Sequence, residues 1–267
     1  MKYWSIALLL FFCTGLLYGQ SEADSLYKRI LLVPYNPQMY ISDSDYDIAR
    51  VSKREIKEMR ERFRLGLDIS LQAVFLTGYD SHSLLRDTNL AAQSEIQAIY
   101  NHSKYAYAVP ERVLQQLAEE DGQPFYKAIF KKKKPEPAPP EKGLTAPDQK
   151  QDPRIKDSDR YLNIQITDPK LLPALADKYG VDLFLFINQF EIQTDFNDCI
   201  DLQNKVYNRK IKVHYSMFNA LGQQVGGDVV ETRFPSNINE AEEIIGRSFP
   251  ELSREMLKQV PEKVEEE

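Results

Sequence analysis

Five consecutive apolar residues, 183–187, stand in the second half of the chain. Such a run leaves neither face of a strand for water, so it predicts a strand in the interior of a sheet, with Phe184 and Leu185 buried on opposite faces. Beyond the run the pattern alternates, which predicts that one face of the strand becomes exposed. The apolar members of this alternation are Phe190 and Ile192, and the polar members, expected on the wet face, are Gln189 and Glu191.

Helical spacing precedes this strand and recurs in two longer segments. Apolar residues at every fourth position over 171–179 predict a helix that ends at a left-handed cap, Gly180. The tetrapeptide 52–55 has the composition of a capping box, which predicts the start of a long amphipathic helix. A last helix is predicted over residues 241–260, where Pro250 should kink or split it.

Further strands are predicted from short apolar or alternating segments. Residues 29–33 form an apolar run closed by prolines, and residues 161–166 alternate. Residues 210–217 also alternate, which predicts an antiparallel strand whose wet face carries His214. A tight turn then returns the chain into a last strand, 225–234, whose paired glycines suggest a bulge.

These segments predict the α/β (α+β) class, with a mixed sheet of about four to five strands and helices packed on it. We interpret residues 20–267 as one such domain with two interruptions. The first is a helical insertion, residues 81–130. The second is a linker, residues 131–159, in which four consecutive lysines precede a proline-rich tract with few large apolar residues. This composition is typical of a disordered segment, because it buries too little apolar surface to order itself.

The insertion contains two predicted helices, residues 89–101 and 110–120, with several tyrosines between them. Tyrosines grouped in this way form either half-buried core or a binding surface. The candidate partner-binding residues are Tyr100, Tyr105 and Tyr107.

The N-terminal residues have the pattern of a secretory signal. A lysine precedes an apolar segment too short to span a bilayer, and Gly19 stands where a peptidase would cut. We therefore expect residues 1–19 to be a signal peptide and the protein to be exported. Lipidation of Cys13 and an uncleaved anchor are the alternatives, and the bulky Phe12 before the cysteine disfavours the first of these.

Charge and cysteine content limit the classes of partner. The chain has 34 basic and 40 acidic residues and a net charge of −6, which gives it no general electrostatic attraction to nucleic acid or anionic lipid. Only Cys199 lies beyond the predicted signal, so no intramolecular disulfide is expected. We interpret its thiol as buried or, alternatively, as part of an intermolecular bridge.

Two acidic clusters resemble metal sites without meeting their requirements. The alternate aspartates of residues 43–47 begin like a calcium loop, but Ile48 and Arg54 stand where the glycine and the terminal acid are needed, so a solvated loop is predicted. The aspartates at every third position of residues 195–201 lie in a predicted polar loop, and no glycine turn or glutamate completes a cation site. We therefore expect no metal and no cofactor.

Three segments of the chain resemble a known domain. They are residues 30–35 before the long helix, residues 175–186 at the central strand, and residues 213–230 with an Asn-Ala-Leu-Gly turn. Together they are similar, over about half of the predicted mature chain, to the small α/β domain of the curli secretion protein CsgG, the N-terminal domain of TolB and the lipoprotein LpoB. Two departures stand out: no strand is evident after residue 79, and no alternating apolar segment has the length of a membrane hairpin.

The resemblance implies a mixed sheet in an envelope protein that works by binding or assembly and has no catalytic residues to transfer. It implies location in the periplasm or at the outer membrane of a Gram-negative bacterium, with an envelope protein partner or a homo-oligomer. Peripheral association with the outer membrane or the cell wall fits the same expectation.

The sequence lacks the common catalytic signatures. It has no Gly-Lys-Ser/Thr phosphate loop, no Gly-x-Ser-x-Gly elbow and no His-Glu-x-x-His motif. A glycosidase carboxylate pair has no local spacing, however, and would leave no signature among the acidic residues. Two hypotheses follow: a non-catalytic binding or assembly module, and an extracytoplasmic hydrolase with a carboxylate site. A deep pocket with two facing acids would favour the hydrolase, and an exposed apolar or tyrosine-rich patch would favour the binding module.

Overall fold

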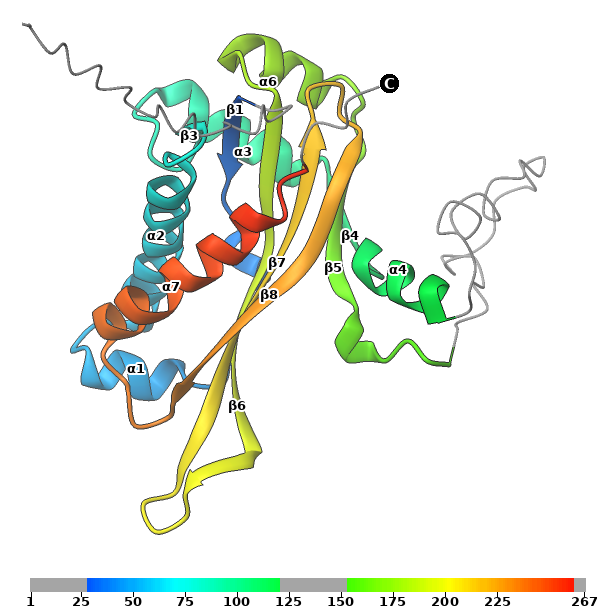
Figure 1. Ribbon diagram of the computed structural model, residues 1–267. Helices are drawn as coiled ribbons and strands as arrows, with labels where there is room; N and C mark the ends of the chain where they lie inside the picture. The colour runs from blue at the N-terminus through cyan, green and yellow to red at the C-terminus, as the bar shows by residue number, and fades with distance from the viewer. Residues whose placement is uncertain (1–27, 121–152, 262–267) are drawn as a thin grey trace, which may run out of the picture.

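A computed structural model describes residues 28–120 and 153–261 and contains a mixed sheet of six strands (Figure 1). The strand order is β3-β1-β6-β7-β8, and β2 also pairs with β6. A second sheet consists of the antiparallel pair β4 and β5. The bounds are β1 (Arg29–Val33), β2 (Tyr40–Ser42), β3 (Asp80–Ser83), β4 (Ser103–Ala108), β5 (Tyr161–Ile166), β6 (Leu183–Asp201), β7 (Val206–Asn219) and β8 (Gln224–Pro235). The predicted fold class is confirmed, with more strands than expected.

Helices cover both faces of the large sheet. Helices α2 and α7 bury their apolar side chains in a first core on one face, while α3 and α6 contribute to a second core on the other. The bounds are α1 (Asp45–Val51), α2 (Ile56–Phe75), α3 (Leu90–Asn101), α4 (Glu111–Glu120), α6 (Leu171–Tyr179) and α7 (Ala241–Lys258), with short 3-10 helices η1 (Pro37–Met39) and η2 (Asp157–Asp159). Among residues 28–120 and 153–261, no helix is long and apolar enough to cross a membrane.

Strand β6 is the central strand that the apolar run predicts. Its first residues pair in parallel with β1 on one side and in antiparallel with β7 on the other. Phe184 lies in the second core and Leu185 in the first, and both are fully buried. The helix before β6 ends at Gly180, whose φ of 62° is the predicted left-handed cap.

A bulge in β6 determines which of the two cores its second half enters. Asn188 has no opposite residue, because its neighbours in β6 pair with the consecutive residues Tyr215 and His214 of β7. This extra residue brings Phe190 and Ile192 onto the same face as Leu185, so they join the first core.

Gln189, Glu191 and His214, all expected to be exposed, are buried on the other face of the sheet, because β5 lies against β6 and β7 there. His214 Nδ1 accepts a hydrogen bond from the backbone N–H of Leu162 in β5, at 2.9 Å. Its Nε2 lies 3.3 Å from Glu191 Oε1, without hydrogen-bond geometry.

The predicted start of the long helix is wrong. Ser52 does not start the long helix but is the C-cap of α1, and its hydroxyl accepts a hydrogen bond from the N–H of Ala241 at 2.8 Å. Helix α2 begins after Glu55, which makes no side-chain cap. Helix α7 runs through Pro250 without interruption, so it is not split, and the kink at Pro250 stays a prediction.

The two helices predicted within residues 81–130 are confirmed as α3 and α4. The structure also has a strand after residue 79, where the sequence shows none, because β3 pairs with β1 in the large sheet. The predicted linker is shorter than expected at its end, because η2 lies within it. The rest of the linker, residues 131–152, and the predicted signal peptide, residues 1–19, lie outside the described residues.

Candidate binding surfaces

The three candidate tyrosines do not present one common surface. Tyr100 is half-buried against the second core; its hydroxyl accepts a hydrogen bond from Arg64 Nη2 at 2.8 Å and lies 2.9 Å from the Tyr35 carbonyl oxygen. Tyr105 is also half-buried there, whereas Tyr107 is exposed. Burial raises the pKa of Tyr100 to about 12. Tyr100 therefore ties α3 to the end of β1, and partner binding by the three residues stays a prediction.

A pocket opens beside that contact, between the end of β1 and the first turns of α2. It has a volume of about 420 Å³, and we call it the β1–α2 pocket. One wall comes from the connection between β1 and β2, and the other comes from one face of α2. The lining residues are Tyr35, Pro37, Tyr40, Ile56, Lys57, Arg60, Glu61 and Arg64.

Two arginines of α2 are fixed at this pocket by different contacts. The guanidinium of Arg60 pairs with Asp45 at 2.7 Å and lies over the ring of Tyr40, 5.1 Å from its centre. Arg64 donates to the Tyr35 carbonyl through Nε at 3.1 Å, while its Nη1 lies 3.6 Å from Glu61. Asp45 is therefore buried at the start of α1, not part of the solvated loop that the sequence predicts.

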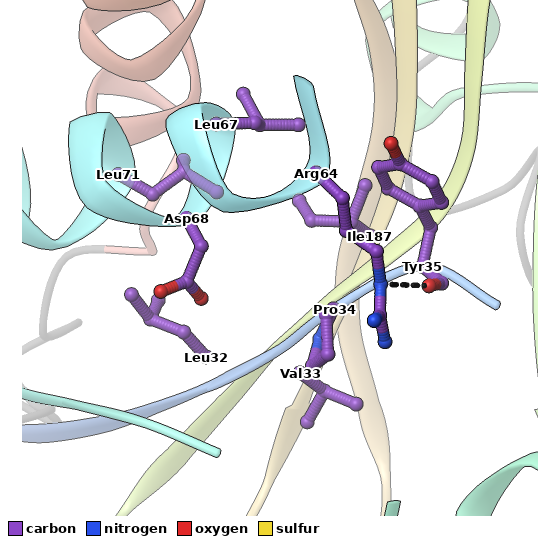
Figure 2. Close-up of a pocket in the computed structure, with 9 residues that line it drawn as sticks. All are labelled: Leu32, Val33, Pro34, Tyr35, Arg64, Leu67, Asp68, Leu71 and Ile187. Atoms are coloured by element: carbon purple, nitrogen blue, oxygen red, sulfur yellow. Dashed lines mark hydrogen bonds between the residues drawn. The ribbon is translucent and has the colours of Figure 1, made fainter. Parts of the chain in front are cut away.

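A much smaller cavity lies deeper, between β1 and α2 (Figure 2). Its volume of about 10 Å³ is at the lower limit for a single water molecule, so it is too small for a ligand. Asp68 lies at its edge and accepts hydrogen bonds from Ser83 Oγ at 2.7 Å and Arg86 Nε at 3.1 Å. Burial raises the pKa of the Asp68 carboxyl, and these hydrogen bonds oppose that effect.

The second surface is the outer part of the β6–β7 hairpin, residues 195–207, which projects from the body of the protein (Figure 1). We call it the projecting hairpin. Its exposed apolar side chains are Phe196, Ile200 and Leu202, with exposed fractions of 71%, 51% and 82%.

Bulges in β6 account for the display of Phe196 and Ile200. Asp195 pairs with Asn208 and Cys199 pairs with Tyr207, so three residues of β6, including Phe196, have no opposite residue in β7. Ile200 is likewise an extra residue, between the pairs that Cys199 and Asp201 make. Bulges of this kind re-aim side chains away from the regular faces of a strand.

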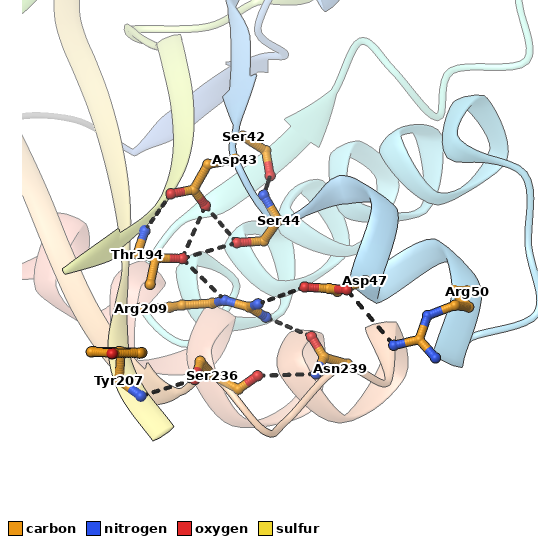
Figure 3. A network of polar contacts seen from close by, with 10 residues as sticks. All are labelled: Ser42, Asp43, Ser44, Asp47, Arg50, Thr194, Tyr207, Arg209, Ser236 and Asn239. Atoms are coloured by element: carbon orange, nitrogen blue, oxygen red, sulfur yellow. Dashed lines mark hydrogen bonds and ion pairs between the residues drawn. The ribbon is translucent and has the colours of Figure 1, made fainter. Parts of the chain in front are cut away.

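A polar network fixes the base of the projecting hairpin (Figure 3). Arg209 of β7 is buried; its guanidinium donates to Asn239 Oδ1 at 2.5 Å and pairs with Asp47 at 3.4 Å. Asp43 accepts a hydrogen bond from the backbone N–H of Thr194 at 2.7 Å. The network thus joins β6 and β7 to the loop before α1 and the loop before α7. A polar pocket of about 370 Å³ lies against it, lined in part by Phe196 and Tyr207.

The predicted polar loop at residues 195–201 is therefore wrong, because these residues form the end of β6. Its aspartates are engaged separately: Asp195 pairs with Lys210, Asp198 with Arg233, and Asp201 accepts hydrogen bonds from Asn204. Across residues 28–120 and 153–261, no three His, Cys, Asp or Glu side chains are grouped to hold a metal ion.

Cys199 lies on the same hairpin, and its thiol is exposed, so the interpretation of a buried thiol is also wrong. The sequence prediction missed the end of β6 because residues 195–201 are mostly polar. No local sequence pattern indicates the Arg209 network or the β1–α2 pocket.

Comparisons with protein-family models, curated proteins and solved structures found no match to this chain.

Proposed function

We propose that this chain is a non-catalytic, exported envelope protein that binds a protein partner through the projecting hairpin. The observation that supports this proposal is the display of Phe196, Ile200 and Leu202 on an element that leaves the body of the fold. An exposed group of large apolar side chains rimmed by polar residues is typical of an interaction surface.

The energetics favour insertion of these side chains into an apolar groove. Full burial of one large apolar side chain contributes about 1.5 to 3 kcal/mol, so three of them supply a substantial part of a binding free energy. The base of the hairpin is held in advance by Arg209 and Asp43, which reduces the conformational entropy lost on binding.

The pockets give less support to the hydrolase alternative. The two acids that line the pocket at the hairpin base are both engaged, Asp43 with the Thr194 amide and Asp47 with Arg209. The β1–α2 pocket is lined by a single acid, Glu61, among three basic residues. Neither arrangement presents the two facing, unengaged carboxylates that such a hydrolase needs.

The test is site-specific crosslinking in the cell envelope. A photoreactive residue at position 202 is expected to crosslink to a discrete protein, and the variant F196S/I200S/L202S is expected to lose co-purification of that protein. Leu90→Ser and Leu221→Ser are matched controls, because these side chains are 86% and 72% exposed but lie on other parts of the fold. Crosslinks between two copies of the chain would identify the partner as a homo-oligomer. Equal co-purification with the triple variant and the controls would contradict the proposal.

Export is tested separately by mass spectrometry and fractionation. A chain processed after Gly19 should begin at Gln20 and be recovered outside the cytoplasm. An intact Met1 or a lipid on Cys13 would contradict cleavage at that position.

A further inference from the structure

The β1–α2 pocket lies at the point in the sheet where a ligand site is expected on topological grounds. β1 and β3 are parallel neighbours; the chain leaves β1 towards α2 and leaves β3 towards α3. Because α2 and α3 pack on opposite faces of the sheet, the chain segments that leave these two strands diverge at their carboxyl ends. In open α/β sheets, ligands bind in the crevice outside the strand ends at such a point. Tyr35, which lines the pocket, comes two residues after β1.

The size and lining of the pocket fit a small organic molecule. Its volume of about 420 Å³ is within the range of ligand pockets, which is about 300 to 1,000 Å³. The apolar surface comes from Ile56 and Pro37 and from the tyrosine rings, and the polar groups come from the face of α2 that also carries Ile56.

The unengaged polar groups of the pocket favour an anion. The ammonium of Lys57 has no hydrogen-bond or ion-pair partner in the described part of the chain, and Arg64 Nη1 has only the 3.6 Å contact with Glu61. The start of α2 adds to this, because no side chain caps it and its free N–H groups carry partial positive charge. The lining has three basic residues and one acid, in a chain whose net charge is −6.

A cationic ligand is disfavoured by the way the aromatic rings are used. Arg60 already lies over the ring of Tyr40, where a ligand cation would bind. The ring of Tyr35 stacks on Phe190, with 5.7 Å between the ring centres. The pocket therefore offers a ligand cation a single acid, Glu61, and an occupied ring.

We propose that the β1–α2 pocket binds a small organic anion that has an apolar, preferably aromatic, body. The anionic group pairs with Lys57 and Arg64, and the apolar body lies against Ile56 and Pro37. This site is separate from the projecting hairpin, so binding there does not depend on the proposed partner contact.

The experiment is a fluorescence titration of the full chain with two probes. The anionic probe is 1-anilinonaphthalene-8-sulfonate, and the uncharged probe of similar shape is N-phenyl-1-naphthylamine. We expect saturable binding of the sulfonate that weakens as salt is added, and weaker binding of the uncharged probe.

Two pairs of variants locate the site. Lys57→Gln is expected to weaken sulfonate binding about twofold to fivefold, as for loss of one exposed ion pair, whereas Lys104→Gln on β4 leaves it unchanged. Ile56→Ala is expected to weaken both probes, and Ile69→Ala is its control on the same helix, since the two side chains are 40% and 44% exposed. The variant F196S/I200S/L202S should bind both probes as the unmodified chain does, which keeps this test independent of the proposed function.

The proposal is overturned by any of three results. These are no saturable binding of the sulfonate, equal affinity for the two probes, and identical titrations of Lys57→Gln and Lys104→Gln. A thermal melt of each variant confirms that it is folded before it is titrated.

Discussion

Phe184 and Leu185 are adjacent in β6 but lie in different hydrophobic cores, and neither is accessible to solvent. Replacement of either residue with alanine leaves a cavity in one core, so we expect each variant to lose about 2 to 5 kcal/mol of unfolding free energy. Urea denaturation measures both losses. Gln193→Ala is the control, because this residue of β6 is exposed, and it should change stability by no more than about 0.5 kcal/mol. Small, similar losses in all three variants would contradict the two-core arrangement.

Arg209 should contribute far more to stability than Arg233, although both are arginines that pair with aspartate. Arg209 is buried between Asp47 and Asn239, whereas the side chain of Arg233 is 49% exposed. Arg209→Ala removes a buried guanidinium together with its contacts to Asn239 and Asp47, and we expect a loss of about 1 to 3 kcal/mol. Arg233→Ala should lose about 1 kcal/mol at most, since exposed ion pairs contribute little. Chemical denaturation of the two variants compares them, and equal losses would mean that the network in Figure 3 does not fix the hairpin base.

Gly227 and Gly226, neighbours in β8, should differ sharply in their tolerance of alanine. A Cβ on Gly227 would lie 2.5 Å from Tyr161 Oη, while a Cβ on Gly226 would meet nothing closer than Met217 at 3.9 Å. We therefore expect Gly227→Ala to cost about 1 to 3 kcal/mol by overpacking and Gly226→Ala to be close to neutral. Thermal melts of the two variants test this. If Gly227→Ala is as stable as Gly226→Ala, Tyr161 of β5 does not pack against Gly227 of β8.

Asp68 should make stability depend on pH in a defined direction. Burial raises its pKa, so the folded chain keeps this proton to a higher pH than the unfolded chain does. The contribution of Asp68 to stability is therefore largest below the ordinary aspartate pKa of about 3.9 and falls as pH rises through the raised value.

Asp68→Asn has no proton to release, so its stability should lack this decline. Denaturation of both proteins at several pH values between about 4 and 7 measures the difference in unfolding free energy. We expect the unmodified chain to lose stability relative to the variant as pH rises. A difference that stays constant would show that the hydrogen bonds from Ser83 and Arg86 cancel the effect of burial on the pKa, and a change in the other direction would show that they outweigh it.

Features set by local pattern could be predicted from the sequence. The apolar run of β6, the left-handed cap at Gly180 and helices α3 and α4 each depend on neighbouring residues, and each is found where expected. The two-sided burial of β6 also followed, because five apolar residues in succession leave no face for water.

Features set by distant contacts could not be predicted. The single extra residue Asn188 reverses the alternation of β6, and only the approach of β5 buries Glu191 and His214. The β1–α2 pocket depends on the hydrogen bond from Arg64 to the carbonyl of Tyr35, which lies 29 positions earlier in the chain. The spacing of residues along the sequence does not predict a contact over that separation.

The place of β1 in the large sheet has a consequence for the order in which the chain folds. Its first backbone N–H donates to the carboxylate of Asp182, a residue 153 positions later, and β2 also finds its partner only in β6. Ribosomal synthesis therefore delivers both strands long before the strand that joins them. Long-range pairing of this kind slows folding, because the chain must close a large loop before it gains the contact. The pairing of β1 and β2 with β6 can therefore form only after residues 183–201 have been made, whereas the pairing of β1 with β3 needs only the first 83 residues.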